Sequence, residues 1–258
     1  MRICHLPRSG LLAILLWLGG QGASHAQSRN VIATGAMRNT MFNGQLAGLL
    51  SLDTLARYGV YGLGPLEALR GELLVVDGHV FVSEVAKDGM VKVTENYSVR
   101  APFFVHAHVQ AWDTIPLPAA VNDLATLDAW LTRWADTRSE PFVFRIQTLV
   151  DSAQIHIMDL PSGTFINGPE EPHAFARSYA LRHMDCELVG FFSSHHKGVF
   201  THHDSNSHVH DHGGSPADGA FGDATLRRRA KAAAGRELGA FQGLYGTSPS
   251  FSKNDKGP

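Results

Sequence analysis

The stretch Gly71-Glu-Leu-Leu-Val-Val-Asp-Gly-His-Val-Phe-Val-Ser-Glu-Val85 decides how this chain is expected to fold. It contains two apolar runs, and Asp77-Gly78 stands between them. An Asp-Gly dipeptide between apolar runs is the strongest short-range signal of a β-hairpin, because both residues tolerate a positive φ. The sequence therefore predicts two strands joined by a tight turn at Asp77-Gly78.

Outward from this hairpin, predicted strands outnumber predicted helices. The expected strands are Phe103–Trp112, Phe142–Ile146, Ala153–Met158, Cys186–Phe192 and Gly198–His203. The expected helices are Ser51–Gly59 and one that begins at Asn122, where Leu124, Leu127, Trp130, Leu131 and Trp134 recur at helical spacing. Strands and helices do not alternate regularly, so we expect an α+β fold with few helices and with mixed or antiparallel sheets.

The chain of 258 residues is long enough for two β-rich subdomains. We expect a signal peptide at 1–26, an N-terminal α/β subdomain at 27–150 and a C-terminal β-rich subdomain at 151–226. The segment 227–258 is rich in Gly, Ala, Ser and Arg with little strand alternation, which is typical of a poorly ordered tail.

The N-terminus has the three parts of a secretory signal. Arg2 and Arg8 give a positive start, 11–18 is a short apolar run, and Ser24-His25-Ala26 has the form of a cleavage site. The run is too short for a membrane anchor. We therefore expect an exported protein, either periplasmic or secreted; the alternative is a buried N-terminal helix.

Charge and cysteine content argue against a nucleic-acid-binding protein and against a protein stabilised by an internal disulfide. Removal of 1–26 lowers the number of Lys and Arg from 22 to 20 against 24 acids, which gives a net charge of −4 and argues against a nucleic-acid partner. Cys4 leaves with the signal, so Cys186 has no partner for an internal disulfide. A buried structural thiol is favoured over a nucleophile.

Seven of the fifteen histidines fall between His195 and His212. Neutral imidazole is a common ligand of transition metals, so this cluster favours a metal site over a solvated loop. If Gly198–His203 pairs with a following strand across a four-residue turn, His203 lies opposite His208, and His210 shares their face. This hairpin predicts His208 and His210 as two ligands of the metal, with His203 as the third ligand.

Several stretches, in the same order along the chain, resemble the acetolactate decarboxylase family: Ser51–Gly64, Gly71–Gly78, Ala101–Val105, Phe144–Ile146, Leu188–Phe192 and Ser207–His210. The 71–78 block and the late His-x-His pair are the specific ones. The resemblance implies a two-domain α/β structure that decarboxylates 2-acetolactate to acetoin, with zinc bound by three histidines.

Carried over by position, the resemblance makes His208 and His210 the paired metal ligands and Glu72 the acidic catalytic residue. It also implies an arginine near the substrate carboxylate. Arg145 is the arginine present in 142–156 and is assigned this role, with His156 as the alternative basic residue. The implied partner is a small 2-hydroxy-3-keto acid. No nucleic acid or membrane anchor is expected, and a homodimer stays open.

The chain departs from the family pattern after His210. Ala220 stands where the family has its third histidine, and nothing in 227–258 resembles the family's last strand with its glutamate. Three explanations are open: an active lyase with another ligand, a disabled member, or a shifted reading frame near Asp211. The alternative function is a non-catalytic, exported, histidine-rich metal binder.

Overall fold

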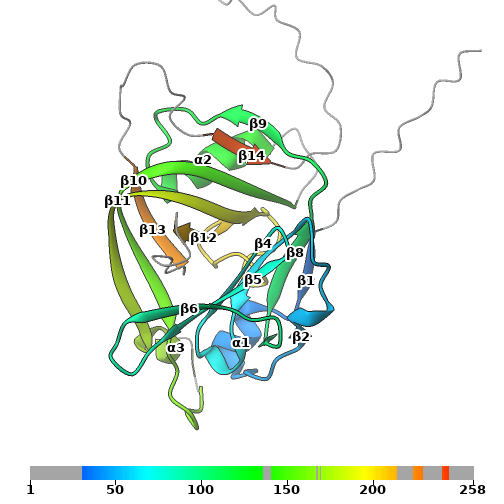
Figure 1. Ribbon diagram of the computed structural model, residues 1–258, viewed down its shortest axis with the longest axis vertical. Helices are drawn as coiled ribbons and strands as arrows, with labels where there is room; N and C mark the ends of the chain where they lie inside the picture. The colour runs from blue at the N-terminus through cyan, green and yellow to red at the C-terminus, as the bar shows by residue number, and fades with distance from the viewer. Residues whose placement is uncertain are drawn as a thin grey trace, which may run out of the picture.

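The computed structural model describes residues 31–135, 141–166, 168, 170–213, 223–228 and 240–243. The predicted signal peptide at 1–26, Ala220 and most of the predicted tail lie outside these residues. Two sheets of six strands make up most of the described chain (Figure 1).

The first sheet has the strand order β1-β8-β3-β4-β5-β6, with every neighbouring pair antiparallel. In that order the strands are Ile32–Thr34, Phe104–His108, Val60–Pro65, Glu72–Val76, His79–Val85 and Val91–Glu95. A two-stranded ribbon of β2 (Leu50–Ser51) and β7 (Arg100–Ala101), the helix α1 (Met37–Asn43), and two short 3-10 turns, η1 (Leu52–Thr54) and η2 (Glu67–Leu69), complete this part.

The predicted hairpin is confirmed. β4 and β5 pair antiparallel, with Val76 opposite His79 across the turn. Asp77 and Gly78 have φ values of 50° and 84°, which are the positive values that the two-residue turn requires. Gly78 also approaches the backbone of Arg57 too closely for any Cβ to fit.

The second sheet is built around two strands of 17 residues each, β10 (Phe142–Met158) and β11 (Ala176–Phe192). They pair along almost their whole length and curve past the first sheet down to α3 (Glu170–Ala174; Figure 1). The remaining strands are β9 (Asp113–Pro116), β12 (Ser207–Gly213), β13 (Asp223–Arg228) and β14 (Ala240–Gly243). Because β11 pairs β12, β12 pairs β13, and β13 pairs β10, these four strands close into a ring with the β10–β11 pair.

The helix expected after Asn122 is α2 (Leu124–Ala135). Its predicted stripe faces the second sheet: Leu127 and Leu131 are buried there against Phe144 and Leu188. With three α-helices among the described residues and antiparallel pairing between all named strands, the predicted fold with few helices is confirmed. None of the described helices is both long and apolar enough to span a bilayer.

An apolar layer joins the two sheets. The first sheet contributes Leu63, Leu74 and Val105, and the second contributes Val189 and Phe191; all five are completely buried. Burial of such side chains is the main favourable contribution to folding, at about 1.5–3 kcal/mol for each. The two sheets therefore pack on each other through one shared layer.

Two predicted elements are wrong. Ser51–Gly59 is not a helix beyond the single turn of η1, because Ser51 pairs with Arg100 in the β2–β7 ribbon and the amide of Leu52 bonds to Val99. Gly198–His203 is a loop held by bonds to the carbonyl of His196, not a strand.

The expected domain boundary at residue 150 and the expected tail at 227–258 both coincide with strands of the second sheet. The division expected at residue 150 falls inside the single strand β10, whereas the two sheets divide between β8 and β9. Within the expected tail, the described residues 240–243 form β14, which pairs with both β10 and β9.

Gly190 of β11 tests how tightly the second sheet is packed. A Cβ at this position would overlap the ring of the buried Phe144. We expect Gly190→Ala to lower the free energy of unfolding by about 1–3 kcal/mol, since overpacking of a dense core forces side chains off their rotamers. Urea unfolding measures this. Gly168→Ala is the control, because an added Cβ there meets no described atom within 4 Å. Equal stability of the two variants would contradict the prediction.

Candidate active site

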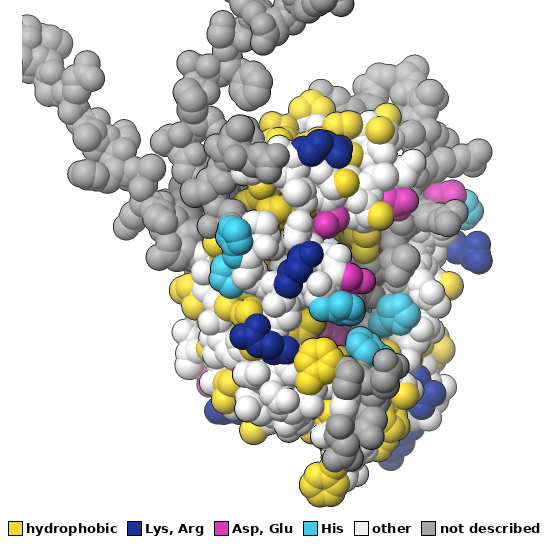
Figure 2. Space-filling model, turned by 180° about the vertical axis from the view of Figure 1, so that it is seen from behind, with side chains coloured by type: hydrophobic (Ala, Val, Ile, Leu, Met, Phe, Trp, Pro, Cys, Tyr) yellow, Lys and Arg dark blue, Asp and Glu magenta, His cyan; other side chains and the backbone are white. Residues whose placement is uncertain are grey.

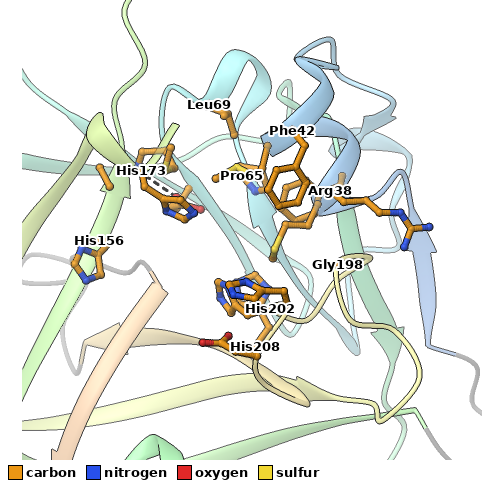
Figure 3. A pocket seen from close by; sticks show the side chains of 17 residues that line it. Arg38, Phe42, Pro65, Leu69, His156, His173, Gly198, His202 and His208 are labelled. Atoms are coloured by element: carbon orange, nitrogen blue, oxygen red, sulfur yellow. Dashed lines mark hydrogen bonds between the residues drawn. The ribbon is translucent and has the colours of Figure 1, made fainter. Parts of the chain in front are cut away.

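A cavity of about 450 Å³ opens between α1, the start of β4, the far end of β10, and the loop that precedes β12. Its lining combines basic and acidic side chains with an apolar group (Figure 3). Glu72, His156 and His208 lie in its wall, and they come from three different strands. The cavity therefore collects residues that are far apart in the sequence.

Glu72 is the buried acid of this cavity. Its side chain starts β4 and is 6% exposed. Its Oε1 accepts a hydrogen bond of 3.2 Å from the backbone amide of Met158, the last residue of β10. A buried carboxyl needs such a donor, since desolvation without one is costly. The position predicted for the catalytic acid is thus inside the cavity.

His208 is held in one orientation. It is buried, and its Nδ1 lies 2.9 Å from the carbonyl oxygen of Phe200. A carbonyl only accepts, so Nδ1 carries the hydrogen and Nε2 carries the lone pair. Donation from one ring nitrogen to a backbone carbonyl is the usual way in which proteins prepare the other nitrogen as a metal ligand.

His208 lies between two other imidazole rings. The centroids of the His202 and His208 rings are 4.9 Å apart, and those of His208 and His210 are also 4.9 Å apart. His202 and His203 both line the cavity, but His203 is exposed. The hairpin that would set His203 opposite His208 does not form, because β12 pairs with β11 instead. The sequence pattern predicts His203 as the third metal ligand, whereas in the structure the ring beside His208 is that of His202.

His210 is buried at 1% exposure and is not part of the cavity lining. No group of three or more His, Cys, Asp or Glu side chains within the described ranges already has the arrangement of a metal site. The chemistry of the imidazoles around His208 nevertheless suits a divalent metal. Neutral imidazole is a common metal ligand, and the hydrogen bond of Nδ1 to Phe200 leaves Nε2 of His208 for the metal.

Arg145 lies away from the cavity. Its Nη1 is 3.2 Å from Oε1 of Glu187, and its guanidinium stands 5.0 Å from the centroid of the Trp112 ring. Along β10 it precedes Met158 by 13 positions, on the order of 40 Å of extended strand. Because Met158 is the residue that meets Glu72, Arg145 cannot reach the same cavity.

His156 lines the cavity from the same strand. The core-facing residues of β10 are Phe144, Ile146 and Val150 before a bulge, and Ala153, Ile155 and Ile157 after it. The bulge at Val150/Ser152 therefore shifts the inward face from even to odd positions, so that His156 faces outward. Its Nδ1 lies 2.9 Å from the hydroxyl of Ser178. The alternative basic residue of the sequence analysis is thus the one in the cavity wall.

One face of the molecule, seen in Figure 2, carries several neighbouring histidine side chains beside acidic ones. Such a grouping of imidazoles and carboxylates suits metal binding and proton transfer at neutral pH. The fold, the buried acid, the oriented histidine and this mixed lining together describe an enzyme-like site.

The model of one protein family, alpha-acetolactate decarboxylase, matches residues 34–212. The chain belongs to this family. The match includes Glu72, His156, His208 and His210, and it ends at His212, so the departure expected after the histidine pair lies beyond it. No curated protein matches the sequence.

Solved structures give the same fold at low identity. A Staphylococcus aureus protein of unknown function, described as similar to alpha-acetolactate decarboxylase, superposes with a TM-score of 0.67 at 15% identity, over 83% of this chain and 85% of that one. The acetolactate decarboxylases of Bacillus subtilis strain 168 and of Bacillus subtilis subspecies spizizenii give TM-scores of 0.61 and 0.65, each at 16% identity and the same coverage.

The loop before His208 is tied to α2. Oδ1 of Asp128 accepts hydrogen bonds from the hydroxyls of Ser205 and Ser207, at 3.0 and 2.7 Å, and from the amide of Asn206, at 3.0 Å. Nδ2 of Asn206 also donates to Thr132 at 3.0 Å. One carboxylate thus fixes the three residues that lead into the strand of the histidines.

We expect Asp128→Ala to lower the free energy of unfolding by about 1.5–3 kcal/mol, the range for hydrogen bonds to a charged group. Urea unfolding followed by circular dichroism measures the change. The control is Asp53→Ala, which removes an exposed carboxylate in η1. A loss no larger than that of the control would show that the Asp128 contacts contribute nothing to the fold.

Behind the histidine pair, a carboxyl is buried in the core. Asp211 is completely buried, and its Oδ2 lies 3.6 Å from Sγ of Cys186. Burial raises the pKa of Asp211 to about 7, partly offset by the hydrogen bond with Cys186. Burial also raises the pKa of the Cys186 thiol, with a further contribution from Asp211, so this thiol is an inert structural one.

The raised pKa of Asp211 predicts a pH-dependent stability. Between the usual pKa of an aspartate, about 4, and about 7, the unfolded chain releases this proton while the folded chain keeps it, so stability falls as pH rises through that window. From pH 5 to pH 8, with a chelator present, Asp211 should account for roughly 2–3 kcal/mol of this fall. Asp211→Asn should remove that part, whereas the exposed Asp53→Asn should not. Identical pH slopes for wild type and Asp211→Asn in urea unfolding would refute this.

Proposed function

We propose that the chain is a lyase that decarboxylates 2-acetolactate, or a closely related 2-hydroxy-3-keto acid, with a divalent metal such as zinc. The observation that carries this proposal is that Glu72 and His208, from different sheets, line one cavity in a member of the acetolactate decarboxylase family. The family is one of carbon–carbon lyases acting on a small acid, and the cavity is of a size to hold one.

The reaction breaks the bond between the carboxylate carbon and the hydroxyl-bearing carbon. Carbon dioxide leaves, the electron pair passes toward the neighbouring ketone, and a proton then forms the new C–H bond. A bound metal ion would act as a Lewis acid on the ketone and hydroxyl oxygens. The protein's own groups must orient the carboxylate and deliver the proton.

Glu72 is the group that we assign to proton delivery. It is buried beside the histidines, and the amide of Met158 occupies one of its oxygens. A positioned carboxyl group of this kind typically contributes 10²–10⁴-fold to the rate.

His156 is the group that we assign to the substrate carboxylate in place of Arg145, since it lies in the cavity wall and Arg145 does not. His208 and His210 would hold the metal. His202 is the preferred third imidazole, because its ring already contacts that of His208, whereas His203 is exposed at the rim.

The second candidate function is a non-catalytic metal binder. The clustering of imidazole rings around His208 supports it independently of any turnover. It differs from the first in requiring neither Glu72 nor His156. The two functions therefore separate on whether metal binding and acetoin formation are lost together.

The deciding test is acetoin formation from racemic acetolactate by the purified chain, with zinc and with chelator. We expect chelator-sensitive acetoin formation that falls at least 100-fold in Glu72→Gln and is lost in His208→Ala. Glu84→Gln and His108→Ala, both exposed and outside the cavity, are the matched controls and should keep full activity.

Zinc content of the same variants separates the two functions. We expect His208→Ala and His202→Ala to lose bound zinc and His203→Ala to keep it, while Glu72→Gln retains zinc without activity. Wild-type protein that binds zinc but forms no acetoin above the spontaneous rate would overturn the lyase and support the metal binder.

A further inference from the structure

The cavity is divided into a polar side and an apolar side. Glu72, His156 and His208 occupy the polar side. α1 contributes Met37, Met41 and Phe42 to the cavity, together with the exposed Arg38, whose guanidinium extends away from Phe42 in Figure 3. Leu69 and Met158 add to the apolar surface. In Figure 3 the side chains of Phe42, Pro65 and Leu69 lie on one side of the cavity, and those of His202 and His208 lie on another.

The cavity is larger than acetolactate requires. An apolar cavity of about 150 Å³ is enough to hold benzene, and acetolactate has nine heavy atoms against the six of benzene, so a cavity of about 225 Å³ would hold it. The volume here is about 450 Å³. With the reacting carbons held at the polar side, the methyl groups of acetolactate would leave most of the apolar surface unfilled.

The apolar side also has the properties of a surface that accepts a ligand. Methionine side chains are flexible and adapt to irregular shapes, and three of them line the cavity: Met37, Met41 and Met158. Phe42 is 42% exposed, so a large part of its ring is open to solvent. An apolar group bound between Phe42 and the methionines would remove this surface from water.

We propose that the preferred substrate is a 2-hydroxy-3-keto acid with one apolar substituent much larger than methyl, of the size of a branched alkyl chain or a phenyl ring. This inference rests on the proposed function, because the carboxylate, hydroxyl and ketone are placed at the polar side by the same residues. The substituent lies against α1. The bonds broken and formed are those of the decarboxylation above, and the substituent takes no part in them.

Binding is tested apart from catalysis with inert analogues. In 2,3-dihydroxy acids the ketone is reduced, so these compounds cannot decarboxylate, and they are compared as methyl and isobutyl forms by titration calorimetry with zinc-loaded protein. Each buried methylene strengthens binding about fourfold, so the three added carbons give at most roughly 60-fold. We expect the isobutyl analogue to bind at least tenfold more tightly than the methyl analogue.

Variants test whether the larger substituent binds at the apolar side of the cavity. Met37→Trp fills the apolar side and should reduce binding of the isobutyl analogue at least tenfold more than binding of the methyl analogue. Met90→Trp makes the same change at a methionine that is 65% exposed and outside the cavity, and should leave the preference intact. If Met37→Trp does not fold, Phe42→Ala should reduce the same preference, with Phe165→Ala, 83% exposed and outside the cavity lining, as its control.

Turnover of the matching keto acids completes the test. A preference for the isobutyl compound in both binding and kcat/KM supports the inference and the proposed function together. A binding preference without decarboxylation of any compound supports the apolar subsite and overturns the lyase. Decarboxylation of acetolactate with no preference for the larger analogue, or with a preference that Met37→Trp and Phe42→Ala leave unchanged, overturns this inference alone.

Discussion

A hydrogen bond between the two sheets lies at the centre of the contacts that form the site. The amide of Met158, at the last position of β10, donates to the buried carboxyl of Glu72 at the first position of β4. Both residues are buried, so this bond offsets part of the cost of removing the two polar groups from water. This contact and the bond from the amide of Leu160 to the carbonyl of Leu69 hold the far end of the β10–β11 ribbon, and His156, two residues before Met158, lies in the cavity wall.

Local chemistry predicted the elements that depend on few residues. The Asp77-Gly78 turn needs only two residues that tolerate positive φ, and α2 needs only an apolar stripe at helical spacing. The family resemblance paired Glu72 with His208, and both line one cavity; nothing in the residues near them indicates that they meet across 136 positions.

Long-range contacts account for the failures. The sequence predicts a strand at 198–203, where Val199, Phe200 and Thr201 are residue types that favour strands. In the structure β12 pairs with β11 instead, and Asp128 of α2 bonds to the end of the loop that joins them. From sequence, Arg145 is assigned to the substrate carboxylate, with His156 as the alternative. That His156 lines the cavity and Arg145 does not follows from the contact of Met158 with Glu72, which no pattern within β10 predicts.

The bulge in β10 has a consequence for how this site can vary. At Asp151 the strand carries one residue that shifts its alternation, and Asp151 pairs with His183, which has a positive φ of 50° on the facing strand. Loss of Asp151 and His183 together would restore regular alternation, with Ile155 and Ile157 still inward and His156 still outward. Loss of one residue from each strand beyond this point would instead turn the residues that follow over, exchanging His156 with its buried isoleucine neighbours. The lining of the cavity wall therefore depends on the number of residues between the bulge and His156 as well as on their identity, whereas the bulge itself can be lost without changing which side chains face the cavity.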